Sequence, residues 1–143
     1  MKEVLIIAGG NGSGKTTIGK ELQKKFNYDF INADEISKEL HGDFKNTLIV
    51  GKEFFNRISK LIAENKSFII ETTLSGKYVG EFIDNLKMSN YSITLIFIFL
   101  KSYKEAIKRI ENRVKEGGHF VPHEDVKRRF YRSINNFENS YKN

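Results

Sequence analysis

The chain has 143 residues, of which 39% are hydrophobic and 29% charged, a balance that suits the core of one compact domain and excludes a disordered chain. Cysteine is absent, which excludes disulfides and thiolate metal sites. The formal net charge of +6 is uneven, because residues 101–143 hold 11 basic and 6 acidic side chains. This basic segment has two interpretations, a nucleic-acid-binding surface or a lid over phosphate groups.

Short apolar runs alternate with helical patterns along the chain. We expect strands at 2–8, 29–32, 68–72 and 93–100, and helices at 15–26, 34–40, 46–65, 77–88, from Ser102 to about Glu116 and from Pro122 to about Tyr141. The alternation predicts a single α/β domain over residues 1–143, with a mostly parallel sheet of buried strands flanked by helices. Ligands of such sheets bind beyond the carboxyl ends of the strands.

No apolar run is long enough to cross a bilayer, and no signal peptide is visible at the N-terminus. We therefore expect a cytoplasmic protein without a membrane partner.

The segment Gly9–Thr16 matches G-x-x-x-x-G-K-[ST] between a predicted strand and a predicted helix, the context that a phosphate-binding loop requires. Backbone N–H groups and the helix N-terminus attract phosphate, Lys15 neutralises the β- and γ-phosphates, and Thr16 offers a hydroxyl to Mg²⁺. The expected nucleotide-binding residues are Gly9, Gly10, Asn11, Gly12, Ser13, Gly14, Lys15, Thr16 and Thr17. ATPases, GTPases and kinases share this loop, so it does not define the reaction.

Carboxylates follow the second and third predicted strands. Asp34 is the candidate general base for an acceptor hydroxyl, although a carboxylate there can also serve only the dipole of a following helix. Glu71 can hold Mg²⁺ or bind substrate hydroxyls. Two such residues predict a pocket for an acceptor.

The basic end contains arginines on both sides of a Gly117-Gly118 break, a pattern that fits a helical lid. Arginines stabilise the charge on a transferring phosphoryl group, and Arg109 and Arg113 share one helical face because they are four residues apart. A solvated basic face is the plainer alternative.

The motifs GGNGSGKTT, INADEI, ETTLSG, RVKEGGHFVP and RRFYRS occur in this order. Together they resemble the zeta-toxin-like P-loop kinases, most closely a compact bacterial branch labelled predicted ABC-type ATPase. The resemblance extends from the first strand to about Asn136. It implies a kinase that uses ATP and Mg²⁺ to phosphorylate a UDP-N-acetyl sugar at its 3′-hydroxyl, and that an antitoxin protein restrains.

Residue roles follow from the same resemblance. Asp34 matches the catalytic base and a substrate contact, and Lys15 and Thr16 match the residues that serve ATP and the metal. The remaining matches are Glu71, Thr73 and His119 for substrate and Arg113, Arg129 and Arg128 for catalysis. Two departures stand out: Gly10 replaces a proline, and the chain ends where similar proteins continue with another strand and helix.

Two alternatives remain open. A polynucleotide kinase would use the basic segment for backbone phosphates and Phe120, Phe130 and Tyr131 for base stacking. A nucleotide-dependent switch would bind ATP and a partner without any acceptor, and the two carboxylates at strand ends argue against it.

Overall fold

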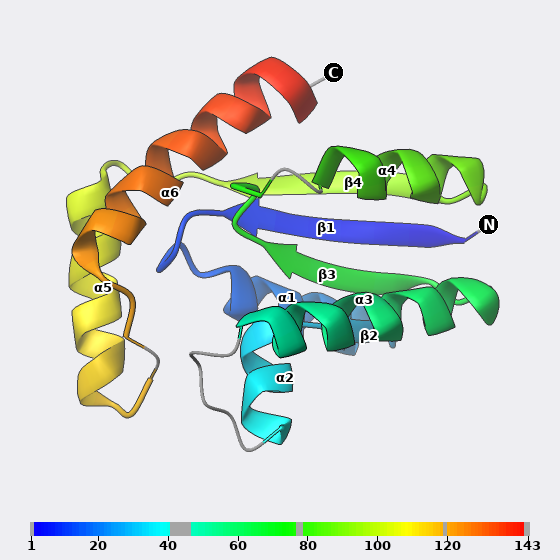
Figure 1. Ribbon diagram of the computed structural model, residues 1–143, viewed down its shortest axis with the longest axis horizontal. Coiled ribbons are helices and arrows are strands. Elements are labelled where there is room, and N and C mark those ends of the chain that lie inside the picture. Colours follow the sequence, from blue (N-terminus) through cyan, green and yellow to red (C-terminus); the bar gives the residue numbers. More distant parts are fainter. Residues whose placement is uncertain (1, 41–46, 77–78, 119, 142–143) are drawn as a thin grey trace.

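The computed structural model describes residues 2–40, 47–76, 79–118 and 120–141. Its centre is a sheet of four parallel strands in the order β2-β3-β1-β4. The strands are β1 (Glu3–Gly9), β2 (Asp29–Ile31), β3 (Phe68–Thr72) and β4 (Ser92–Ile98). The predicted parallel α/β sheet is confirmed, and all four carboxyl ends meet at the left-hand side of Figure 1.

Six α-helices occur in the described part of the chain: α1 (Lys15–Phe26), α2 (Ala33–Glu39), α3 (Thr47–Ala63), α4 (Val79–Met88), α5 (Tyr103–Lys115) and α6 (His123–Asn136). Their positions agree with the predicted helices to within a residue or two. The end of the last helix differs, because α6 stops at Asn136 and continues as the π-helix η1 (Phe137–Tyr141).

The sheet has a core on each face, because successive side chains of β1 point in opposite directions. Leu5 and Ile7 pack with Ile69 and with Ile18 and Leu22 of α1. The opposite face holds the larger core, in which α2, α3 and α4 contribute to a cluster with the inner strands; its largest members include Val4, Ile6, Phe54, Ile58, Phe68, Ile70 and Leu86. These layers fix β1, and therefore the loop that follows it.

The expectation that every strand is buried is wrong for β4. The side chains of β1 are nearly all buried, whereas β4 contains no buried side chain. The physical reason is position, since β4 lies at the sheet edge with β1 as its one neighbour. An apolar run therefore did not distinguish a central strand from an edge strand.

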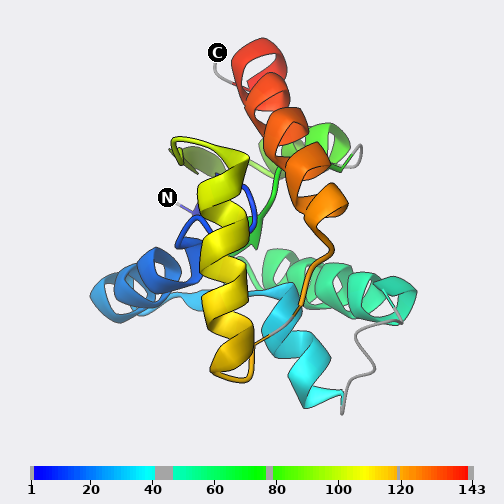
Figure 2. The same cartoon turned by 90° about the vertical axis from the view of Figure 1, so that its left-hand side faces the viewer.

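Helices α5 and α6 form a hairpin that crosses the carboxyl ends of the strands (Figure 2). Ser102 caps α5 as predicted, since its Oγ accepts the N–H of Glu105 at 3.3 Å. The helix ends at the predicted glycine break, where Gly117 adopts a φ of 90° and Gly118 N–H bonds the carbonyl of Arg113 at 2.8 Å. The hairpin has its own small core of Ala106, Ile110 and Val126.

No helix in the described ranges is both long and apolar enough to cross a membrane.

Candidate active site

The loop after β1 approaches α5 closely at Gly12. Its φ is 78°, and a Cβ there would lie 2.8 Å from the carbonyl oxygen of Ala106. Only glycine combines this backbone conformation with this approach. Gly10 is different, because its φ is not in the left-handed region and a Cβ would meet Phe130 at an ordinary 3.7 Å. The replacement of proline by Gly10 thus falls at a position where the surroundings tolerate a side chain.

The N-terminus of α1 faces out of this loop. Gly14 caps the helix in a left-handed conformation without a side-chain hydrogen bond, so the first N–H groups of α1 remain available to an anion. Asn11 Oδ1 and Ser13 Oγ are two of the three buried side-chain atoms in the described residues that have no hydrogen-bond partner. A loop with free donors and unpaired polar atoms fits a polar ligand such as a nucleotide phosphate.

Lys15 lies inside the loop and is only 6% exposed. Its Nζ donates to the carbonyl oxygen of Gly10 at 2.8 Å. Burial lowers the pKa of Lys15 to about 8; the carboxylates of Glu71 and Asp34 oppose this shift, and Arg113 adds to it. The ammonium group of Lys15 is therefore poorly solvated, and it lies where it would neutralise the charge of a bound phosphate.

Glu71, at the end of β3, accepts two hydrogen bonds on one oxygen. The hydroxyl of Thr16 donates to Oε2 at 2.9 Å, and the Asn32 amide donates to the same atom at 2.7 Å. Burial raises the pKa of Glu71, while Lys15 and the Thr16 hydrogen bond lower it. The predicted metal-binding hydroxyl and the predicted acid are thus neighbours.

Asn32 was not among the residues predicted from the sequence, yet it is buried and bonds both Glu71 and Asp34. Its Nδ2 holds Glu71, and its Oδ1 accepts the N–H of Asp34 at 2.8 Å as the N-cap of α2. An asparagine directly before a predicted helix is a recognisable N-cap signal, but its second contact depends on β3. Asp34 is exposed at the start of α2, open to an acceptor.

An open cavity of about 370 Å³ lies between the loop and α5. One wall is formed by Gly12, Gly14 and Thr17. The other wall consists of side chains from α5 and its C-cap: Arg109, Asn112, Arg113 and Glu116. The predicted common face of Arg109 and Arg113 is confirmed, while Asn112 and Glu116 had no signal beyond their helical spacing from these arginines.

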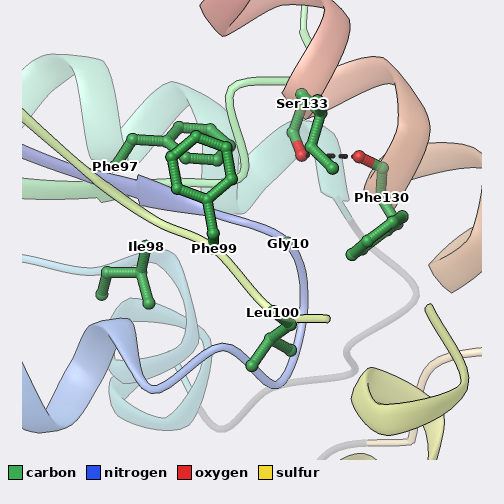
Figure 3. A pocket seen from close by; sticks show the side chains of 8 residues that line it. Gly10, Phe97, Ile98, Phe99, Leu100, Phe130 and Ser133 are labelled. Carbon is green, nitrogen blue, oxygen red and sulfur yellow. Dashed lines mark hydrogen bonds between the residues drawn. The ribbon is translucent and has the colours of Figure 1, made fainter. Parts of the chain in front are cut away.

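A second, much smaller cavity of about 10 Å³ lies behind the loop (Figure 3). Gly10, the end of β4 and α6 line it, and its walls are apolar except where the Ser133 hydroxyl donates to the Phe130 carbonyl at 3.0 Å. Its size suits one water molecule rather than a ligand. It shows that α6 packs directly on the phosphate loop.

The structure brings some of the predicted residues together. Lys15, Thr16, Asp34, Glu71 and Arg113 form one group, in which Arg113 and Asp34 act on the pKa values of both Lys15 and Glu71.

The other predicted residues make different recorded contacts. Arg128 is exposed and pairs with Asp125 at 3.1 Å, and neither Arg128 nor the half-buried Arg129 is among the charges that shift Lys15 or Glu71. The Thr73 hydroxyl bonds that of Ser75 at 2.7 Å. His119 lies outside the described residues.

The residues present fit Mg²⁺ and ATP. Magnesium prefers oxygen ligands and commonly uses one or two protein groups plus water and phosphate, which Thr16 and Glu71 can supply. The described residues contain no cluster of three acidic or histidine side chains that would form a metal cage. The loop, the α1 N-terminus and the α5 wall offer a nucleotide both N–H donors and cations.

A phosphate loop beneath a basic helical hairpin, with two carboxylates at adjacent strand ends, defines the class as a P-loop kinase, a phosphotransferase. Comparison with known proteins gives the family. The zeta toxin family model matches residues 1–142, so the chain belongs to the zeta toxin family.

Curated relatives include an uncharacterized protein and several kinases. An uncharacterized protein of Haemophilus influenzae is 27% identical over 90% of this chain and 92% of its own length. A shikimate kinase of Parabacteroides distasonis is 32% identical over 78% of this chain and 65% of its own length.

Among solved structures, a chain of the Pnkp1/Rnl/Hen1 RNA repair complex superposes with a TM-score of 0.82 at 20% identity, over 96% of this chain and 45% of that chain. The PezAT toxin–antitoxin system of Streptococcus pneumoniae gives a TM-score of 0.67 at 19% identity, over 96% of this chain and 64% of that chain. At these identities the likeness shows the fold.

Proposed function

We propose that the chain transfers the γ-phosphate of ATP to a hydroxyl of a small molecule, and that this acceptor is a UDP-N-acetyl sugar. The observation that carries the proposal is the linkage of Asp34, Asn32 and Glu71 beside Lys15. A kinase needs a carboxylate beside the loop to receive the acceptor proton, and the exposed Asp34 is anchored there through its backbone N–H. Membership of the zeta toxin family supports the sugar nucleotide as acceptor.

In this mechanism the acceptor hydroxyl lies against Asp34, which takes its proton as the oxygen bonds the γ-phosphorus. The bond from that phosphorus to the β–γ bridging oxygen breaks, and ADP leaves with the electron pair. Lys15 and Arg113 stabilise the charge on the moving group. Bound Mg²⁺, held by Thr16 and Glu71, would neutralise phosphate charge. Arg129 and Arg128 on α6 complete the proposed cationic set.

The PezAT likeness also supports a protein antitoxin as partner, because a kinase that consumes a sugar nucleotide needs restraint.

The test is transfer of label from γ-labelled ATP with Mg²⁺ to UDP-N-acetylglucosamine, other UDP-sugars, nucleosides and 5′-hydroxyl oligonucleotides. Label is expected on the UDP-N-acetyl sugar. Lys15→Ala should abolish transfer, and Asp34→Asn should lower turnover by more than about tenfold with ATP binding nearly intact. Full activity in Asp34→Asn would remove Asp34 from the mechanism, and release of label only as free phosphate would favour a switch ATPase.

A second candidate, a nucleic-acid kinase, is favoured by one surface observation. Tyr131 on α6 is 54% exposed, it lies 5.9 Å from the ring of Tyr103, and Lys127 sits over that same ring. Exposed aromatic rings among cations are typical of single-strand binding. Label on oligonucleotides, with binding that weakens steeply as salt rises, would replace the sugar with a nucleic acid.

A further inference from the structure

The loop after β3 contains an unusual backbone conformation. Leu74 has a φ of 60°, a left-handed conformation that a leucine adopts only at a cost of about 1–2 kcal/mol. The other three positive-φ residues apart from glycine in the described ranges are asparagines, which tolerate it. The Leu74 side chain is fully buried with Ala8 and Val79. Its surroundings must therefore impose this conformation.

Two hydrogen bonds hold the backbone of Leu74. Within the loop, the Thr72 hydroxyl accepts the Leu74 N–H at 3.1 Å. From the far end of the chain, Asn136 Nδ2 donates to the Leu74 carbonyl oxygen at 2.6 Å. The second bond links this loop to the end of α6, 62 positions further along the chain.

Asn136 is itself fixed. It is the last residue of α6, and the ring of the next residue, Phe137, stacks on Phe97 of β4 with centroids 4.5 Å apart. Near its middle, α6 sets Phe130 against Gly10 in the phosphate loop. Helix α6 thus contacts both the phosphate loop and the loop that follows β3, which contains Thr73.

We propose that Asn136 is a positioning residue for the phosphoryl acceptor. By holding the Leu74 carbonyl it sets the conformation of residues 72–76 and so places Glu71 and Thr73 relative to the phosphate loop. The proposal deepens the proposed kinase function and rests on it. Asn136 touches no reacting atom in this scheme and acts through Leu74 alone.

The variant Asn136→Asp tests this directly, because it keeps the size of the side chain but replaces the donor with a carboxylate that repels the Leu74 carbonyl. Its matched control is Asn135→Asp on the same helix, since Asn135 is exposed and its side chain acts as an acceptor, from Asn139 at 2.7 Å. The pair Asn136→Ala and Asn135→Ala repeats the test without added charge. Asn136→Gln, which keeps an amide donor, should recover part of the lost function.

Two measurements decide the outcome. Hydrogen exchange of the Leu74 amide should become at least about tenfold faster in Asn136→Asp and stay within about twofold in Asn135→Asp. In transfer to UDP-N-acetylglucosamine, kcat/KM for the acceptor should fall about tenfold or more, while the Kd of a fluorescent ATP analogue stays within about twofold.

Unchanged exchange would overturn the role of Asn136 in the loop. Faster exchange with unchanged acceptor kinetics would overturn its role in positioning. If the wild-type protein phosphorylates no acceptor, the proposed function fails, and the exchange measurement still decides whether Asn136 holds the loop.

Discussion

The two walls of the 370 Å³ cavity are built in different ways. The loop wall consists of Gly12 and Gly14 with Thr17 of α1, and beside it Lys15 is buried and donates a hydrogen bond to the Gly10 carbonyl. The α5 wall is made of long, exposed side chains, and Arg109 is engaged with Glu105 of its own helix at 3.3 Å. The contrast indicates that the phosphate loop is preorganised, whereas the arginines must be drawn in by the ligand.

In the loop wall, a substitution at Gly12 should reduce ATP affinity the most, because the loop approaches α5 closely there. Gly12→Ala forces an unfavourable φ and a clash with the Ala106 carbonyl, so we expect ATP affinity to fall about a hundredfold, while Gly10→Ala should change it less than about threefold. Titration with a fluorescent ATP analogue measures both. Equal losses in the two variants would show that the loop does not have the shape described.

The α5 wall should matter for turnover more than for binding. Arg113→Ala should lower kcat by about ten- to a hundredfold and weaken ATP binding less, because the proposed role of Arg113 is to stabilise charge that develops during transfer. Arg128→Ala serves as the comparison; its arginine already pairs with Asp125, and a loss below about threefold would remove it from the catalytic set. Steady-state kinetics on both variants make the test.

Because Lys15 is buried, we expect ATP binding to be coupled to the uptake of a proton. Its pKa is lowered to about 8, and bound phosphates should restore a value near the ordinary 10.5, so binding takes up a proton above pH 8. ATP affinity should thus fall about tenfold from pH 7 to pH 9. Calorimetry in two buffers of different ionisation enthalpy should show nearly one proton taken up at pH 9 and almost none at pH 7. Equal uptake at both would contradict the shift.

The buried charge of Lys15 should also lower the free energy of unfolding of the protein without nucleotide. Because the folded pKa lies below the unfolded one, the unfolded chain binds more protons between pH 8 and 10.5, and wild-type stability should rise across that window. Lys15→Met should be more stable than wild type by about 1–2 kcal/mol at pH 7, and the gap should close as the pH rises. Denaturant melts at pH 7 and 9.5 test this; a less stable variant at pH 7 would refute it.

The features that were predicted correctly from the sequence are those that depend on the spacing of residues close together in the chain. The phosphate loop, the Ser102 cap and the shared face of Arg109 and Arg113 each depend on residues a few positions apart, and the structure bears them out. The parallel sheet followed from the alternation of strands and helices.

Local sequence patterns could not predict contacts between segments that are distant in the chain. Asn32 joins Glu71 across separate strands, and Asn136 bonds Leu74 across 62 positions. The edge position of β4 was not predicted for a similar reason. An apolar run indicates hydrophobicity but not the number of neighbouring strands. Assigning Arg128 and Arg129 by motif left their orientation open; of the three proposed catalytic arginines, Arg113 is the one named among the charges that shift the pKa values of Lys15 and Glu71.

The strand order also has a consequence for synthesis on the ribosome. The phosphate loop follows β1, which is made first, yet Val4 pairs only with Phe68 and Ile93, and β2 pairs with β3 alone. The nascent chain therefore carries its nucleotide motif through about the first half of translation without a sheet to support it, with an apolar strand exposed to chaperones. A ribosome-bound fragment that ends before β3 should bind no ATP, however intact its motif.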